Sequence, residues 1–331
     1  MIENFIKIIE TDRYRIRFNV MTGFEVMVGI NGHDDPWVLD VPNLMDIGIM
    51  GTCFNRCSFC YQGDNQESNM KIEDYKRLIY NAKDHVNQVA LGGRGNPDEH
   101  FNFYEILAYT KQCGVVPNYT TAGNTFTPEK AEISKMCGSV AVSMYHQDYT
   151  FSALKMLMDA GVKTNIHWIV STNTLPTILR FIRDKEDVFN GMVDVKRLNA
   201  IVFLLFKTCG RGSNHPEWIV PDDGVKEFID AVRKHKGPYK IGLDSCMVGR
   251  ISNVAGLTEE EKVFCDTCEG SRMSAYVTPD MKLLPCSFGK TIVDGVDLMT
   301  NTLKEAWNSD LFKKFRFKLE EKPFECPWGF W

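Results

Sequence analysis

Polar and apolar residues alternate along two segments near the start of the chain. Residues 14–20 and 24–30 both show a period of two, and a Met-Thr-Gly turn separates them. Alternation of this kind indicates β-strands with one buried face, and a short turn between two such runs indicates a hairpin. The pattern therefore predicts a short N-terminal β-hairpin extension, which we place at residues 1–42.

From about residue 43 to residue 245, short apolar segments typical of strands alternate with segments of helical period. Six strands are predicted, at residues 45–50, 88–91, 115–121, 139–144, 163–170 and 199–206. Strict alternation of strands and helices indicates a parallel sheet with right-handed crossovers. Because the strands are short and uniform, we expect an α/β core in the form of a partial (β/α)6 TIM-like barrel. Functional residues should then lie on loops at the carboxyl ends of its strands.

After residue 245 the pattern changes again. Residues 274–278 and 283–284 flank a turn at 279–282, and residues 301–319 have helical period. These features predict a third part of the chain, residues 246–331, built from a β-hairpin and a terminal helix.

The composition and net charge limit the classes of molecule that this protein is expected to bind. The 331 residues include 44% hydrophobic and 24% charged side chains, with a formal net charge of −5, which is ordinary for a globular protein. No run of like charge favours a nucleic acid or a membrane surface as partner. Since the chain has neither a secretory segment nor an apolar run of about 18 residues, we expect a cytoplasmic protein.

The eleven cysteines are the most unusual feature of the composition. An odd number of cysteines in a cytoplasmic chain argues for metal binding rather than for disulfides. Three are close together in the sequence, Cys53, Cys57 and Cys60. They lie just after the first strand of the predicted barrel.

Three thiolates with this spacing fit a [4Fe–4S] cluster better than a zinc site. A tetrahedral zinc site needs a fourth ligand, whereas three cysteines on a [4Fe–4S] cluster leave one iron open for chemistry. A zinc site with a distant fourth ligand, or three structural thiols, is the alternative.

The Cys-x3-Cys-x2-Cys spacing, with the aromatic Phe59 before the last cysteine, resembles the defining motif of radical S-adenosylmethionine (SAM) enzymes. Residues 91–97, Leu-Gly-Gly-Arg-Gly-Asn-Pro, resemble the glycine-rich segment with which this family holds the methionine amino group. Asn96 replaces the usual acidic residue there. The resemblance implies reductive cleavage of SAM to a 5′-deoxyadenosyl radical that abstracts a substrate hydrogen. It also implies a reducing electron donor such as flavodoxin or ferredoxin.

Further site residues follow from the resemblance and from their places at strand ends. The residues expected to contact the cofactor are Phe59, Gly92, Gly93, Gly95, Asn96, Asn124, Ser143, Asn165 and His167. Phe59 should pack near the adenine. Tyr145, Lys207 and Arg211 are expected to frame the substrate as catalytic residues, and the Gly-Arg-Gly loop could bind a carboxylate through Arg211.

A second group of cysteines lies in the C-terminal part. Cys246, Cys265, Cys268 and Cys286 surround the predicted hairpin, an arrangement that resembles the SPASM domain or its shorter twitch form. The resemblance implies an auxiliary [4Fe–4S] cluster held by these four residues, with Cys326 as a possible replacement for Cys246. A structural zinc ion is the alternative, because a Cys-x2-Cys pair with two distant cysteines suits zinc equally well.

The SPASM and twitch resemblance indicates an enzyme that modifies a peptide or protein by crosslinking, oxidation or epimerisation. Two alternatives stay open at this point. One is a radical SAM dehydrogenase or rearrangement enzyme for a small molecule. The other is a non-catalytic iron–sulfur or zinc-binding scaffold, which would not cleave SAM.

Overall fold

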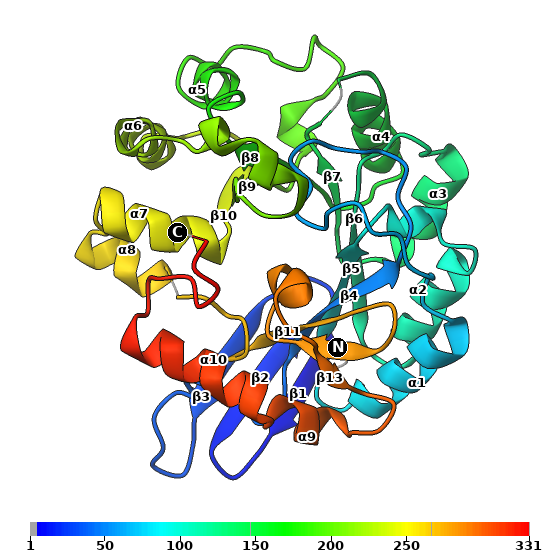
Figure 1. Cartoon of the computed structure of the whole chain (residues 1–331). Coiled ribbons are helices and arrows are strands. Elements are labelled where there is room, and N and C mark those ends of the chain that lie inside the picture. Colours follow the sequence, from blue (N-terminus) through cyan, green and yellow to red (C-terminus); the bar gives the residue numbers. More distant parts are fainter. Residues whose placement is uncertain (1–4, 146, 266, 331) are drawn as a thin grey trace.

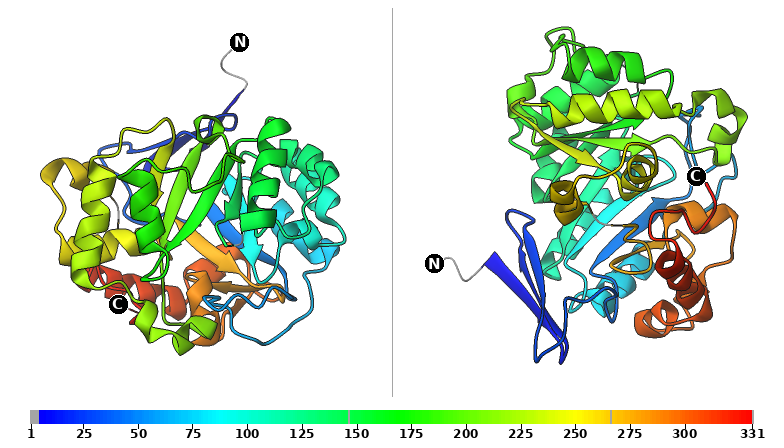
Figure 2. Two further views of the ribbon diagram at one scale, coloured as in Figure 1. Left: turned by 90° about the horizontal axis from the view of Figure 1, so that it is seen from above. Right: turned by 90° about the vertical axis from the view of Figure 1, so that its left-hand side faces the viewer.

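The computed structural model describes residues 5–145, 147–265 and 267–330. The N-terminal part is a small antiparallel sheet with the order β1 (Ile6–Glu10), β2 (Tyr14–Asn19) and β3 (Glu25–Gly29). The predicted hairpin is present as β2 and β3. Strand β1 adds to it, although its Ile-Lys-Ile-Ile-Glu sequence breaks the alternation. The sheet stands to one side of the main body (Figure 2).

The main body is built on a ten-stranded sheet that contains the six predicted strands. Its parallel strands follow one another in chain order: β4 (Leu44–Met50), β5 (Gln88–Gly93), β6 (Val116–Thr121), β7 (Val140–Ser143), β8 (Thr164–Val170), β9 (Ala200–Leu205) and β10 (Lys240–Leu243). Strand β10 was not predicted, because four residues that include Lys240 and Gly242 form no apolar run.

Helices cover one face of this sheet and leave the other face for the site. They are α1 (Ile72–Ala82), α2 (Phe103–Gln112), α3 (Pro128–Ile133), α4 (Gln147–Asp159), α5 (Leu175–Ile182) and α6 (Asp222–Arg233), on the outside of the curved sheet (Figure 1). Ile166 and Trp168 of β8 are buried toward the helices. Because side chains alternate along a strand, Asn165 and His167 point to the opposite face, which we call the inner face.

The C-terminal part extends the same sheet. It contains α7 (Ser245–Val254), α8 (Glu259–Phe264), β11 (Ser274–Val277), β12 (Lys282–Leu284), β13 (Val296–Asp297), α9 (Leu303–Trp307) and α10 (Asp310–Glu321). Strand β11 pairs in parallel with β4, and β12 pairs antiparallel with β11, so the predicted hairpin is present. The predicted terminal helix is divided at Asn308 and Ser309 into α9 and α10.

The pairing of β11 with β4 brings a C-terminal side chain onto the inner face of the barrel sheet. Tyr276 is the register partner of Asp46. A Cβ atom on Gly48 would lie 2.3 Å from the Tyr276 hydroxyl, and one on Gly93 would lie 2.8 Å from it. The tyrosine ring therefore needs glycine at both positions.

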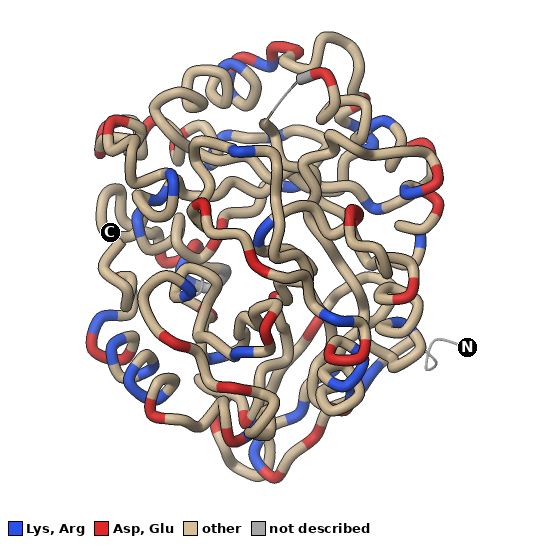
Figure 3. The backbone as a smooth tube through the Cα atoms, turned by 45° about the vertical axis from the view of Figure 1, so that its right-hand side comes forward, with Lys and Arg blue, Asp and Glu red and all other residues tan. Residues whose placement is uncertain are grey.

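Basic and acidic residues are interleaved on the same elements rather than separated into two regions (Figure 3). None of the helices in the part of the chain that the structure describes is both long and apolar enough to span a membrane.

Candidate functional site

The first three cysteines lie together on the loop that joins β4 to α1. The Cys60 amide donates a hydrogen bond to the Cys57 carbonyl at 3.1 Å, and Arg56 takes a positive φ of 48°, so the loop turns tightly between the thiols. Burial, and then the neighbouring thiols of Cys60 and Cys53, raise the pKa of Cys57 to about 11. The loop thus gathers three partly exposed free thiols at the carboxyl end of β4.

Two amide side chains from the same loop fix the segment that leads into Cys53. Gln66 accepts from the Cys53 amide at 2.9 Å and donates to the Cys53 carbonyl at 3.0 Å. Asn69 accepts from the Gly51 amide at 2.9 Å. Sequence reasoning missed both residues, because a polar residue that bonds its own loop leaves no periodic signal.

Arg211 comes from the loop after β9 and contacts the cysteine loop directly. Its Nε donates to the Cys57 carbonyl at 2.8 Å, and its backbone amide donates to the Cys60 carbonyl at 2.8 Å. Its Nη1 lies 2.6 Å from a carboxylate oxygen of Asp64. The guanidinium group is therefore engaged by the cysteine loop, and the expected contact with a substrate carboxylate stays a prediction.

Gly210 lets the loop after β9 approach the cysteine loop closely. It has a φ of +55°, and a Cβ atom there would lie 2.4 Å from the carbonyl carbon and oxygen of Tyr61. A side chain at this position would therefore collide with backbone.

We expect Gly210→Ala to lower the melting temperature more than Gly256→Ala does. Both glycines have a positive φ, but a Cβ atom on Gly256 would meet nothing within 4 Å. The left-handed backbone costs about 1–2 kcal/mol in both variants, and the overlap adds about 1–3 kcal/mol at Gly210 alone. Thermal unfolding of the two variants measures the difference, and equal melting temperatures would show that the two loops do not touch.

The glycine-rich segment at the end of β5 packs against the start of the cysteine loop. A Cβ atom on Gly95 would lie 2.3 Å from the Thr52 carbonyl oxygen, whereas one on Gly92 would meet nothing within 4 Å. Gly95 therefore serves close packing, and the open side of Gly92 leaves space beside the backbone for a ligand.

Three asparagines link the glycine-rich segment to its neighbours. Asn96 is 4% exposed; it donates to Asn124 at 2.7 Å and accepts from the Ala122 amide at 2.8 Å. Asn55, between the first two cysteines, donates to the same oxygen of Asn124 at 3.4 Å. The structure thus brings the predicted pair, Asn96 and Asn124, to the rim of the cysteine loop.

The other predicted cofactor residues lie at different depths on the inner face. Ser143 and His167 are register partners on β7 and β8, and Nδ1 of His167 lies 3.4 Å from the Thr120 hydroxyl. Burial lowers the pKa of His167 to about 4, although Asp244 opposes the shift, so the imidazole is neutral at pH 7. Asn165 lies roughly 7 Å deeper along β8 and accepts from Asn199 at 2.7 Å.

Phe59 and Tyr145 form an aromatic pair beside the cysteines. Their ring centroids are 5.1 Å apart in an edge-to-face arrangement at 80°. Tyr145 is 38% exposed, and burial together with the nearby Cys57 thiol raises the pKa of its hydroxyl. The pair joins the end of β7 to the cysteine loop.

Lys207 lies between the barrel and the C-terminal part. Its side chain is 4% exposed, and its amino group is 3.1 Å from a carboxylate oxygen of Asp244. It also lies 4.3 Å from the centre of the Phe288 ring. Its charge is therefore compensated, and its expected role beside the substrate stays a prediction.

Four thiols of the C-terminal part are electrostatic neighbours. Apart from burial, which is the main cause, Cys326 raises the pKa of both Cys268 and Cys286, and Cys268 and Cys286 raise that of Cys246. The pKa of Cys265 is raised by burial and by Glu261. The chain after α10 returns to α7 (Figure 1), where Asn253 donates to the Phe324 carbonyl at 3.3 Å, and this return brings Cys326 into the group.

N–H groups surround these sulfur atoms. The Trp328 indole donates to the Cys286 sulfur at 3.0 Å, and the backbone amides of Phe288 and Gly289 also lower the pKa of Cys286. Three amides, from Trp328 to Phe330, act on Cys326 in the same way. Hydrogen bonds to sulfur are a main means by which proteins tune iron–sulfur clusters, so the donor set fits such a cluster.

The two cysteine groups are neighbours. The rings of Tyr61, next to Cys60, and Phe288, near Cys286, have centroids 4.6 Å apart. The buried Cys209 has Cys60, Cys286 and Cys326 among its electrostatic neighbours. Within the described ranges, no three Cys, His, Asp or Glu side chains converge as they would around a bound metal ion, so the ligand assignments stay predictions.

Sequence reasoning also missed a buried polar group between the two cysteine groups. The Tyr276 hydroxyl and the side-chain amide of Gln62 are both buried; burial raises the pKa of the tyrosine, and a hydrogen bond with Gln62 opposes this shift. Burial, and then the like charge of Glu269, raises the pKa of the nearby Asp46 to about 7. A carboxyl inside the apolar segment Leu-Met-Asp-Ile-Gly-Ile-Met of β4 is a signal that could have identified Asp46.

We expect Asp46→Asn to stabilise the metal-free chain at pH 8 and to change its stability little near pH 4. Between its ordinary pKa of 3.8 and its folded pKa of about 7, folded Asp46 keeps a proton that the unfolded chain releases. Raising the pH through this window therefore destabilises the folded wild type. Melting temperatures of both proteins from pH 4 to 8 test this, and a constant difference would contradict the raised pKa.

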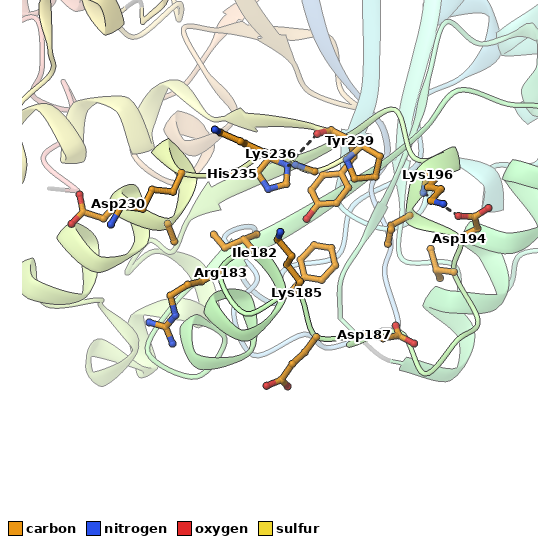
Figure 4. A pocket seen from close by; sticks show the side chains of 18 of the residues that line it. Ile182, Arg183, Lys185, Asp187, Asp194, Lys196, Asp230, His235, Lys236 and Tyr239 are labelled. Carbon is orange, nitrogen blue, oxygen red and sulfur yellow. Dashed lines mark hydrogen bonds between the residues drawn. The ribbon is translucent and has the colours of Figure 1, made fainter.

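A pocket of about 780 Å³ lies between α5, α6 and the loops that lead into β9 and β10. Lys185 and Tyr239 point into it (Figure 4). Because these loops precede their strands, the pocket is at the opposite end of the sheet from the cysteine loop. None of the predicted site residues lines it.

Comparison with known proteins identifies the C-terminal part of the site region. Residues 268–327 match the family model of SPASM, an iron–sulfur cluster-binding domain; the match includes Cys268, Cys286 and Cys326 and begins after Cys265. No curated protein sequence matches the chain at a significant level.

Solved structures share the fold along most of the chain. Streptococcus suis SuiB has a TM-score of 0.71 at 13% identity, over 96% of this chain and 90% of SuiB. SuiB bound to the precursor peptide SuiA gives 0.68 at 12% identity, over 94% and 90%. Native anSMEcpe with bound AdoMet gives a TM-score of 0.59 at 14% identity, over 83% of this chain and 82% of anSMEcpe. The predicted fold class and the resemblance to SPASM-type radical SAM enzymes are thereby confirmed: the chain has the fold of these enzymes, and its residues 268–327 match the SPASM iron–sulfur cluster-binding domain.

Proposed function

We propose that this protein is a radical SAM enzyme whose first cluster is held by Cys53, Cys57 and Cys60. The observation that carries the proposal is the set of three free thiols on one loop, packed against a glycine-rich segment at the carboxyl edge of the sheet. Three thiolates leave one iron of a [4Fe–4S] cluster open. When bound, the cluster and SAM supply a 5′-deoxyadenosyl radical.

The chain's own residues would position SAM between the cysteine loop and the inner face. The open backbone beside Gly92 suits the methionine ammonium group, and the amides of Asn96 and Asn124 suit its carboxylate or the ribose. Ser143 and the neutral His167 offer hydrogen bonds without adding a charge. Asn165 lies deeper and would face the substrate. The Phe59–Tyr145 pair, with centroids 5.1 Å apart, offers a surface for the adenine.

We further propose that the C-terminal thiols hold an auxiliary [4Fe–4S] cluster. The mutual effects on pKa and the N–H donors favour Cys246, Cys268, Cys286 and Cys326 as its ligands, with Cys326 in place of Cys265 from the sequence-based set. The Tyr61–Phe288 contact of 4.6 Å between centroids would provide an aromatic path between the two proposed clusters. Such a path suits an auxiliary cluster that would take up the electron released when the substrate radical, formed by hydrogen abstraction, is oxidised to product.

The proposed substrate is a peptide or protein, and the proposed reaction is an oxidative modification of it. SuiB has the same fold and binds the precursor peptide SuiA. Within the described residues, β1 and β3 pair only with β2, and Ile8, Val26 and Val28 are exposed. Two open edges suit the docking of an extended peptide, and Ile8, Val26 and Val28 share one face of this sheet with Arg15 and Arg17. Tyr145 and Lys207 would then frame the reacting residue.

Anaerobic reconstitution with iron and sulfide, followed by reduction in the presence of SAM, tests the enzymatic proposal. We expect 5′-deoxyadenosine and methionine to form even without substrate, at a low uncoupled rate. Reconstituted protein that holds a four-iron cluster and forms neither product would be a scaffold rather than an enzyme of this class.

A further inference from the structure

Two arginines reach the same carbonyl group just after the cysteine motif. Arg94, in the glycine-rich segment, donates from Nη1 to the Gly63 carbonyl at 3.0 Å and from Nη2 to the Gln62 carbonyl at 2.6 Å. Arg211, in the loop after β9, donates from Nη1 to the Gly63 carbonyl at 3.1 Å. The two guanidinium groups thus hold the segment after Cys60 from two different loops.

The charges of these arginines are poorly compensated. Arg94 is 3% exposed, its Nε has no hydrogen-bond partner, and it forms no ion pair with any residue in the described ranges. Among the described residues, Arg211 is paired with the carboxylate of Asp64 alone, whose side chain is 79% exposed and therefore well screened by water. A buried cation that is bonded to neutral carbonyls rather than to a carboxylate keeps its charge largely uncompensated, so this region is suited to a negative charge.

We propose that Arg94 and Arg211 act as positioning residues that raise the reduction potential of the first cluster. This inference rests on the proposed function, because it requires a cluster on Cys53, Cys57 and Cys60. Reduction adds one negative charge to a cluster that already carries thiolate charge. Nearby cations stabilise the reduced form more than the oxidised form, and charge and hydrogen bonding are known determinants of cluster potential.

Arg211→Gln tests the inference in the reconstituted protein through an EPR-monitored redox titration without SAM. We expect the ratio of reduced to oxidised first cluster at a fixed potential to fall about tenfold, which is about 59 mV for a one-electron couple. Arg211→Lys keeps the charge and should lie nearer to wild type. Arg183→Gln removes an exposed arginine that pairs with Asp184 and Glu227 at the opposite end of the sheet, and it should change nothing.

Asp64→Asn keeps the test valid if Arg211→Gln impairs folding. Removing an exposed carboxylate leaves both arginines in place and should shift the potential in the opposite direction, toward easier reduction. An unchanged potential in both Arg211→Gln and Asp64→Asn would overturn the inference. A shift that appears only after SAM is added would also overturn it, because the arginines would then act on the SAM carboxylate. If the wild type shows no reducible first cluster at all, the proposed function itself is wrong.

Discussion

Replacing Cys53, Cys57 and Cys60 together with alanine is expected to abolish the formation of 5′-deoxyadenosine in reconstituted, reduced protein. The three thiols are the only cysteines on the loop between β4 and α1, so no other thiol of this loop can substitute for them. Without this cluster, no open iron is left at the carboxyl edge of the sheet to bind SAM. Liquid chromatography of quenched reactions measures the product.

Cys113→Ala is the matched control for the loss of a thiol. Cys113 ends α2, away from both cysteine groups, and its replacement should leave product formation unchanged. Retained 5′-deoxyadenosine formation in the triple variant would exclude the assigned cluster site.

The second large effect concerns the iron content of the C-terminal part. Two [4Fe–4S] clusters correspond to about eight irons per chain, and the triple alanine variant should keep about four. Cys286→Ser and Cys326→Ser should each destabilise or remove the auxiliary cluster, because these thiols lie in one electrostatic group with Cys268. Cys265→Ser should keep about eight irons. Iron, sulfide and zinc analysis of each purified variant measures the outcome.

Two results would change this assignment in different ways. Loss of iron in Cys265→Ser, with retention in Cys326→Ser, would restore the ligand set inferred from sequence. One zinc ion and no iron in the triple alanine variant would identify the C-terminal site as a structural zinc site.

The fold of the core could be predicted because its determinants are local. Alternating apolar strands and amphipathic helices are visible within windows of a few residues, and this is enough to indicate a parallel α/β sheet. The pairing of β11 with β4 could not be predicted in this way. It joins segments more than 200 residues apart, and its consequence, Tyr276 over Gly48 and Gly93, depends on that contact.

In the site, too, local sequence patterns could be predicted, whereas contacts between distant segments could not. The cysteine loop and the glycine-rich segment were recognised from spacing along the chain. The contacts of Arg211 were not predicted, because the sequence of a polar loop does not indicate which carbonyl groups an arginine in it will bond. Cys326 was left as an alternative because its place depends on the path of the chain after α10.

The most direct test of the account is the EPR spectrum of the reduced first cluster before and after addition of SAM. The measurement is cleanest in a Cys268→Ala/Cys286→Ala variant, which should retain only that cluster. If Cys53, Cys57 and Cys60 leave one iron open, SAM binds that iron, and the g-values of the signal should shift on addition. An identical signal with and without SAM would contradict the central claim that this loop builds a SAM-binding cluster.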